Sequence, residues 1–193
     1  MAGRLIYVMG PSGSGKDTVL QGLHGLMGGD GYMAPRLVTR PAHGKEPWAV
    51  PVSMAEFVRL ERDGRMAMAW RAHGLAYGVL RDIDDKLAEG CDVLVNGSRE
   101  YLPEAGRRYP DLVPVLLTVD NTLLRRRLTD RGRESDARIG ERLARNRRFT
   151  SMTCHAAGVP IFVLDNSGAA NDAVHTLYRY LMRGQPGRLP SCN

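Results

Sequence analysis

The stretch Gly10-Pro-Ser-Gly-Ser-Gly-Lys16-Asp17-Thr18 decides the fold of this 193-residue chain. It fits the P-loop pattern G-x-x-x-x-G-K, but Asp17 stands where a serine or threonine usually follows the lysine. The apolar run Arg4–Met9 before it is typical of a buried strand, and a helical pattern from Lys16 to about Met27 follows it. Strand, glycine loop and helix in this order predict a loop that binds the phosphates of a nucleoside triphosphate.

Each part of this stretch has an expected role. The glycines let backbone N–H groups curve around a phosphate, and the following helix N-terminus adds partial positive charge. We expect Lys16 to contact the β- and γ-phosphates and to be catalytic, because its charge can follow the phosphoryl group as it transfers. For Mg²⁺ we rank the hydroxyl of Thr18 above Asp17, since a carboxylate near polyphosphate is repelled unless metal lies between them. The predicted ATP ligands here are Gly10, Pro11, Ser12, Gly13, Ser14, Gly15, Lys16, Asp17 and Thr18. A glycine-rich turn without nucleotide is the alternative, disfavoured by the strand and helix in register.

Strands alternate with helices along the rest of the chain. Apolar runs at Asp92–Asn96, Val113–Val119 and Ile161–Leu164 are typical of strands, and stretches long enough for helices separate them. This pattern predicts an α/β fold, a three-layer P-loop NTPase with a parallel central sheet.

A smaller unit is expected between the first helix and the later strands. A capping box at Ser53–Glu56 opens a helix, and a hairpin follows over Met66–Trp70 and Leu75–Val79. Residues 41–52 contain three prolines and are expected to form an irregular loop.

Composition narrows the class of protein. The chain is 43% hydrophobic and 25% charged, which suits one folded domain and excludes a disordered or collagen-like chain. We expect this domain over residues 1–183 and a flexible tail over 184–193. The three cysteines lack metal or disulfide spacing, and no signal peptide or membrane span is evident, so a cytoplasmic protein without membrane partners is expected.

The positive charge is concentrated in one segment. Ten arginines and four acidic residues lie between Arg125 and Arg148, and together they account for the formal net charge of +6. A local excess of this kind indicates a specific polyanion site. Nucleic acid is not the expected partner, because the segment has no interleaved aromatic residues and matches no nucleic-acid-binding module.

The residue that ends the strand Asp92–Asn96 helps to distinguish between classes of P-loop protein. Motor ATPases and GTPases usually end a later strand with a carboxylate that holds Mg²⁺, whereas this strand ends with an amide. The chain also has no guanine-reading N-K-x-D motif. A small-molecule kinase is therefore expected.

Five segments match motifs of one known family: Gly10–Lys16, Val38–His43, Tyr77-Gly78, Arg127–Glu134 and Arg142-Leu143. Through them the chain resembles the guanylate kinase family of nucleoside monophosphate kinases over nearly its whole length. The resemblance implies a core, an acceptor-binding part at 34–79 and a mobile, arginine-rich lid at 125–148. It implies that Arg131 and Arg142 of the lid contact the transferring phosphoryl group, and Asn166 is a further candidate ATP contact.

The departures from guanylate kinases are informative. Ala69 stands before Trp70, where guanylate kinases place the glutamate that reads guanine; Asn96 replaces an aspartate and His43 an arginine. With Asn96-Gly-Ser-Arg99, these features resemble the ribose 1,5-bisphosphate phosphokinases. That resemblance implies ATP- and Mg²⁺-dependent phosphorylation of the 1-phosphate of ribose 1,5-bisphosphate to 5-phosphoribosyl 1-diphosphate, in phosphonate catabolism. The implied acceptor contacts are Arg40, Tyr77, Asn96 and Arg99.

Two other functions stay open at this stage. A guanylate or other nucleoside monophosphate kinase is the first, although Ala69 argues against it. A guanylate-kinase-like binding module without catalysis is the second, although such a module would be expected to lose the loop lysine, and Lys16 is present. Residue types do not predict the oligomeric state.

Overall fold

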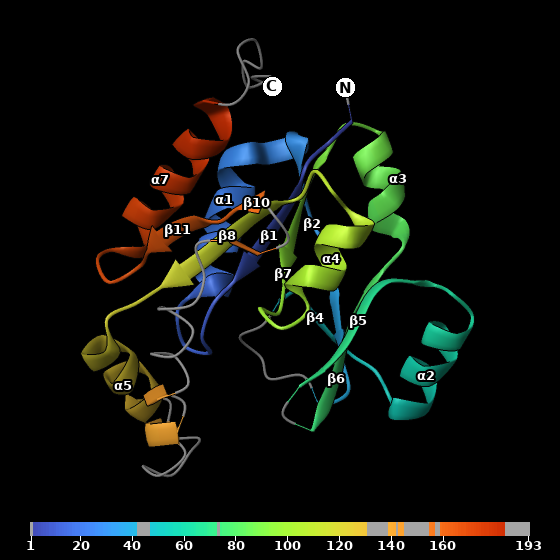
Figure 1. Ribbon diagram of the computed structural model, residues 1–193, viewed down its shortest axis with the longest axis horizontal. Helices are drawn as coiled ribbons and strands as arrows, with labels where there is room; N and C mark the ends of the chain where they lie inside the picture. The colour runs from blue at the N-terminus through green and yellow to red at the C-terminus, as the bar shows by residue number, and fades with distance from the viewer. Residues whose placement is uncertain are drawn as a thin grey trace.

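A parallel sheet forms the centre of the molecule. The computed structural model describes residues 2–41, 47–72, 74–130, 139–141, 143–144, 155–156 and 159–183. Within these residues five strands pair in parallel in the order β11-β8-β1-β7-β2 (Figure 1). Their bounds are Leu5–Met9 for β1, Gly31–Met33 for β2, Asp92–Asn96 for β7, Val113–Thr118 for β8 and Phe162–Asp165 for β11. The expected parallel sheet is therefore confirmed.

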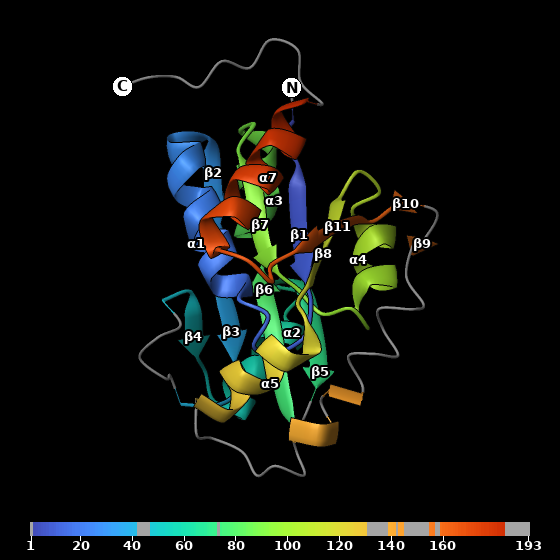
Figure 2. The ribbon, with the colours of Figure 1, turned by 90° about the vertical axis from the view of Figure 1, so that its left-hand side faces the viewer.

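Helices cover both faces of this sheet. In β1 alternate side chains enter opposite cores: Leu5, Tyr7 and Met9 pack in one, and Ile6 and Val8 pack in the other. Helices α3 (Asp82–Ala88) and α4 (Leu102–Arg108) lie over the first face, and α1 (Lys16–Met27) and α7 (Ala170–Arg183) over the second (Figures 1 and 2). Because β1 and β7, in the middle of the sheet, are buried on both faces, the α/β three-layer fold follows.

A second sheet lies beyond the carboxyl ends of the central strands (Figures 1 and 2). Its order is β4-β3-β6-β5. Helix α2 (Met54–Arg62) packs against it through the buried Phe57. The predicted helix start is confirmed, because Ser53 caps α2: its Oγ accepts a hydrogen bond from the Glu56 backbone N–H at 3.1 Å. The strands are β3 (Arg36–Val38), β4 (Ala49–Pro51), β5 (Met66–Ala72) and β6 (Leu75–Leu80), so the expected hairpin is also confirmed.

The expectation of an irregular loop at 41–52 is wrong for its last part. Strand β4 pairs in parallel with β3, and Arg36 donates its backbone N–H to the carbonyl of Trp48. Three residues carry little strand pattern of their own, so pairing with a neighbouring strand decides their conformation.

The chain after β8 is described in part. Helix α5 (Asn121–Asp130) buries Leu124 and Leu128 against Ile139 and Leu143. The described residues also include the short elements η1 (Gly28–Asp30), β9 (His155–Ala156) and β10 (Val159–Pro160). Most of the expected lid and the tail at 184–193 lie outside the described residues. In the described part, every helix is too short or too polar to cross a bilayer.

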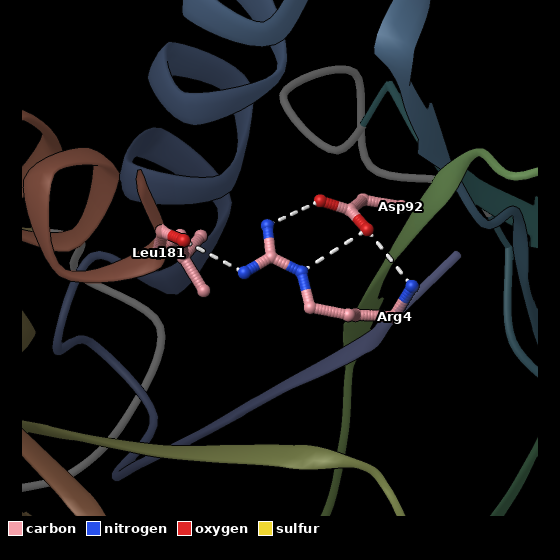
Figure 3. Close-up of polar contacts among 3 residues, drawn as sticks. All are labelled: Arg4, Asp92 and Leu181. Atoms are coloured by element: carbon pink, nitrogen blue, oxygen red, sulfur yellow. Dashed lines mark hydrogen bonds and ion pairs between the residues drawn. The ribbon is translucent and has the colours of Figure 1, made fainter. Parts of the chain in front are cut away.

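A buried ion pair closes the amino end of the central sheet (Figure 3). Asp92 is 1% exposed, and the Arg4 guanidinium donates to both of its carboxylate oxygens, at 3.2 Å from Nε and 2.6 Å from Nη2. Arg4 Nη1 also donates to the carbonyl of Leu181 at 2.7 Å. These bonds connect β1, β7 and α7 at the end of the sheet opposite the P-loop.

Candidate active site

The P-loop (residues 10–16) requires glycine at two positions with left-handed backbone. Gly13 has φ +92° and Gly15 has φ +91°, a region that other residues adopt only with strain. A Cβ on Gly15 would also lie 2.6 Å from Asn166 Nδ2. Helix α1 begins directly after this loop, at Lys16, so the loop's amides and the helix N-terminus lie together. This is the local geometry that suits a bound phosphate.

Lys16 folds back along the loop. Its Nζ donates hydrogen bonds to the carbonyls of Gly10 and Pro11, both at 3.0 Å. The ammonium is therefore held beside the first residues of the loop, where it is near any anion that the loop binds.

Asn166 supports the loop from below. It is 2% exposed, its backbone N–H donates to the carbonyl of Thr118, and its Nδ2 donates to the carbonyl of Ser14 at 2.7 Å. Its Oδ1 has no hydrogen-bond partner among the described residues. The structure therefore assigns Asn166 a role in holding the loop, while its direct contact with ATP stays a prediction.

Arg127 is a candidate that the sequence analysis did not single out. Its Nη2 donates to the carbonyl of Asn166 at 3.3 Å, while its buried Nη1 has no partner in the part of the chain described. The helix that carries it, α5, also places Leu124 and Leu128 against Gly13. Its position as first arginine of the lid motif was the available signal.

Asp17 and Asn96 meet across the site. Asn96 ends β7, is 5% exposed, and donates from Nδ2 to Asp17 Oδ1 at 2.7 Å. Thr18, the next residue of α1, is exposed. Of the two predicted metal ligands, Asp17 is the one that contacts the end of β7. The structure therefore joins a predicted metal ligand to a residue predicted to contact the acceptor.

The loop that follows β7, Asn96-Gly-Ser-Arg99, packs on a buried tyrosine. The Tyr7 hydroxyl donates to the carbonyl of Ser98 and accepts from its backbone N–H, both at 2.9 Å. Burial raises the pKa of this phenol well above its usual value. A Cβ on Gly97 would overlap the Tyr7 ring, so only glycine fits there. Tyr7 thereby fixes the loop that carries Arg99.

Aromatic rings organise the second sheet near this loop. Tyr77 stacks on Trp70 with centroids 5.7 Å apart and planes at 12°, and Trp70 also contacts Tyr101. The Arg36 guanidinium lies 5.5 Å from the centre of the Tyr77 ring. Trp70 is buried, as expected of a core residue. These contacts join the second sheet to the segment that leads into α4.

The remaining predicted residues divide into two groups. Arg40 follows β3, is half-buried and donates to the carbonyl of Pro41 at 3.3 Å. Ala69 is partly buried against an apolar cluster of the second sheet. Arg131, Arg142 and His43 lie outside the described residues, so the roles expected of them stay predictions.

Known proteins resemble this chain closely in sequence and in fold. A "Ribose 1,5-bisphosphate phosphokinase PhnN" from Pseudomonas paraeruginosa is 51% identical over 184 residues, 94% of this chain and 96% of the relative. A protein of the same name from Pseudomonas fluorescens is 48% identical over 94% of each chain. No protein-family model matches the chain.

The solved structures agree on the fold. Guanylate kinase from Anaplasma phagocytophilum superposes with a TM-score of 0.74 at 18% identity, over 95% of this chain and 87% of that one. At this identity the likeness concerns the fold alone, a P-loop kinase fold with a second sheet at one end. Since the sequence relatives cover nearly the whole chain at 40–51% identity, the chain belongs to the ribose 1,5-bisphosphate phosphokinase PhnN family.

Proposed function

We propose that this protein transfers the γ-phosphoryl group of ATP to the 1-phosphate of ribose 1,5-bisphosphate, giving 5-phosphoribosyl 1-diphosphate and ADP. The observation that carries the proposal is the intact P-loop with Lys16 in place, in a chain of the PhnN family. This phosphoryl transfer is proposed to take place in the cytoplasm, as a step of phosphonate catabolism, as the resemblance implies.

The chemistry needs positioning and positive charge more than it needs a base. The nucleophile is an oxygen of the 1-phosphate, whose second pKa near ~6 leaves it largely deprotonated at neutral pH. This oxygen forms a bond to the γ-phosphorus while the bond from that phosphorus to the β–γ bridging oxygen breaks, and ADP leaves. Two polyanions must therefore be brought together, and catalysis consists of alignment and charge neutralisation.

The chain's own residues divide this work. The P-loop amides hold the β-phosphate, and Lys16 follows the charge on the transferring group. Arg40, Tyr77 and Arg99 are proposed to hold the phosphates of the acceptor. Arg131 and Arg142, in the segment expected to form the lid, are proposed to contact the transferring group.

The residues at the end of β7 fit a magnesium ion. Mg²⁺ prefers oxygen ligands and keeps several waters, and this region offers the Asp17 carboxylate and the buried, unpartnered Oδ1 of Asn96 among the described residues. The exposed hydroxyl of Thr18 is the third candidate oxygen. When bound, Mg²⁺ would neutralise part of the charge on the β- and γ-phosphates.

The experiment is ³¹P NMR of the protein with MgATP and ribose 1,5-bisphosphate. New diphosphate doublets together with ADP signals are the expected result. A parallel coupled assay for ADP with GMP as acceptor separates the rival kinase. Turnover on GMP alone would overturn the proposal, and ATP binding without turnover on either acceptor would identify a non-catalytic module.

A further inference from the structure

The contact between Asp17 and Asn96 exchanges the two groups usually found at these positions. A P-loop usually has a hydroxyl after its lysine, and a carboxylate at the end of a neighbouring strand helps to hold Mg²⁺. Here the carboxylate follows Lys16 on α1, and an amide ends β7. The site thus keeps one carboxylate, moved from the strand to the helix.

The geometry determines which way the Asn96 amide points. An ionised carboxylate can only accept hydrogen bonds, so the atom 2.7 Å from Asp17 Oδ1 must be Nδ2. Oδ1 is then directed elsewhere, and it is buried without a partner among the described residues. A buried carbonyl oxygen left in this way calls for a donor that the described part of the chain does not supply.

The backbone holds Asn96 firmly in this place. Asn96 is in parallel register with Val8 of β1, the strand that leads into the P-loop, and the Gly97 N–H donates to the Val8 carbonyl at 2.9 Å. Tyr7 fixes the next residue, Ser98, from below. The backbone that carries Asn96 is therefore fixed beside the P-loop strand, at the place from which its Nδ2 reaches Asp17.

We infer that Asn96 is a positioning residue of the metal site: its N–H group orients the Asp17 carboxylate, and its Oδ1 accepts a hydrogen bond from water bound to Mg²⁺. The inference rests on the proposed use of MgATP. It reassigns Asn96 from the acceptor contact that the sequence suggested to the nucleotide side of the site. Residues that orient a metal's ligands in this way typically change metal affinity about 10–100-fold when removed.

The test measures metal and nucleotide binding without acceptor or turnover. Isothermal titration calorimetry gives the Kd of a non-hydrolysable ATP analogue without and with Mg²⁺. The Kd without Mg²⁺ divided by the Kd with Mg²⁺ reports the metal's contribution. Asn96→Ala is expected to reduce this ratio about tenfold. In the Asp17→Asn background, the further loss caused by Asn96→Ala should be smaller than in the wild type, because part of the effect of Asn96 is exerted through Asp17.

Asn166→Ala is the matched control, since Asn166 is an equally buried amide that supports the loop without contacting Asp17. It should weaken analogue binding equally with and without Mg²⁺ and so leave the ratio unchanged. If Asn96→Ala does not fold, Asn96→Ser keeps a small polar group there but is too short to reach Asp17, and should show the same loss.

Two results would overturn the inference. One is an unchanged Mg²⁺ ratio in a folded Asn96→Ala variant; weaker binding of ribose 1,5-bisphosphate, measured separately, would then identify Asn96 as an acceptor ligand. The other is fully additive losses in the double variant. Because no acceptor is present in the metal titration, its outcome is separate from the NMR test of the proposed function.

Discussion

The two ends of strand β7 carry buried polar side chains that differ in how completely they are hydrogen-bonded. Asp92 begins the strand, and both of its carboxylate oxygens accept from Arg4 (Figure 3). Asn96 ends the strand four residues later, and only its N–H side is bonded within the described chain. The strand is equally buried at both ends, so burial does not explain the difference.

More incompletely bonded atoms gather at the same end as Asn96. Ser14 Oγ, Asn166 Oδ1 and Arg127 Nη1 are buried and have no partner among the described residues. Folded proteins pair nearly all buried polar atoms, so a cluster of exceptions is informative. It lies where parallel α/β sheets bind ligands, beyond the carboxyl ends of their strands. The amino end therefore contributes stability, and the carboxyl end is arranged to bind a ligand.

Lys16→Ala should impair the function of the site at the carboxyl end of the sheet more than any other substitution considered. Turnover should fall by about 10³-fold or more, because the variant removes the cation that follows the transferring charge. The fold should persist, since the hydrogen bonds that Lys16 Nζ donates to Gly10 and Pro11 lie within its own loop. Steady-state kinetics and circular dichroism check the two parts.

The matched control for this variant is Lys86→Ala. Lys86 lies on α3 near the start of β7 and pairs with Glu89 on the surface. Turnover of this variant should equal that of the wild type. A comparable loss in both lysine variants would contradict a special role for Lys16.

Asp92→Asn should show the opposite behaviour, a loss of stability without a loss of catalysis. Removing one charge of a buried pair leaves Arg4 without its counter-ion, and the free energy of unfolding should fall by about 3 kcal/mol. Urea unfolding measures this loss, and kcat measured well below the unfolding temperature should be unchanged. A kcat lowered by tenfold in a folded sample would mean that the two ends are coupled.

A surface pair gives the scale for this comparison. Glu61 and Arg71 form a two-bond ion pair on the exposed side of the second sheet, and Arg71 lowers the pKa of Glu61. Because water screens this pair, Glu61→Gln should cost less than about 1 kcal/mol.

Local patterns predicted those parts of the molecule that local interactions decide. The strand Asp92–Asn96 was predicted with the bounds that the structure shows, because every residue in it is buried and its three middle residues are apolar. The P-loop was predicted for a similar reason: Gly13 and Gly15 have left-handed backbone that favours glycine, so the local sequence carries the signal. By contrast, β2 and β4 are strands because they pair with β7 and β3, and their own short sequences did not predict them.

The same distinction applies to the candidate site. The sequence identified both Asp17 and Asn96 but assigned them to different ligands, because they are 79 positions apart and their contact depends on strand order. Asn166 and Ser14 are 152 positions apart, so the support that Asn166 gives to the loop was equally hidden. Residue types at a site can thus be predicted before their partners can.

Gly97→Ala offers the finest test of how the carboxyl end is held. A methyl group at this position would overlap the Tyr7 ring, and the resulting shift should cost about 1–3 kcal/mol of stability. The shift should also displace Asn96 and Arg99 on either side and lower kcat. Thermal unfolding and kinetics measure the two effects.

Gly25→Ala is the matched substitution that tests whether the Tyr7 contact is the cause. Gly25 lies within α1, and a Cβ there would meet nothing within 4 Å. Because alanine favours helix more than glycine does, this variant should gain up to about 1 kcal/mol and keep its kcat. Tyr7→Phe keeps the ring but removes both bonds to Ser98, so it should lower stability without the overlap. If Gly97→Ala were as well tolerated as Gly25→Ala, close packing on Tyr7 would not be what fixes Asn96 beside Asp17.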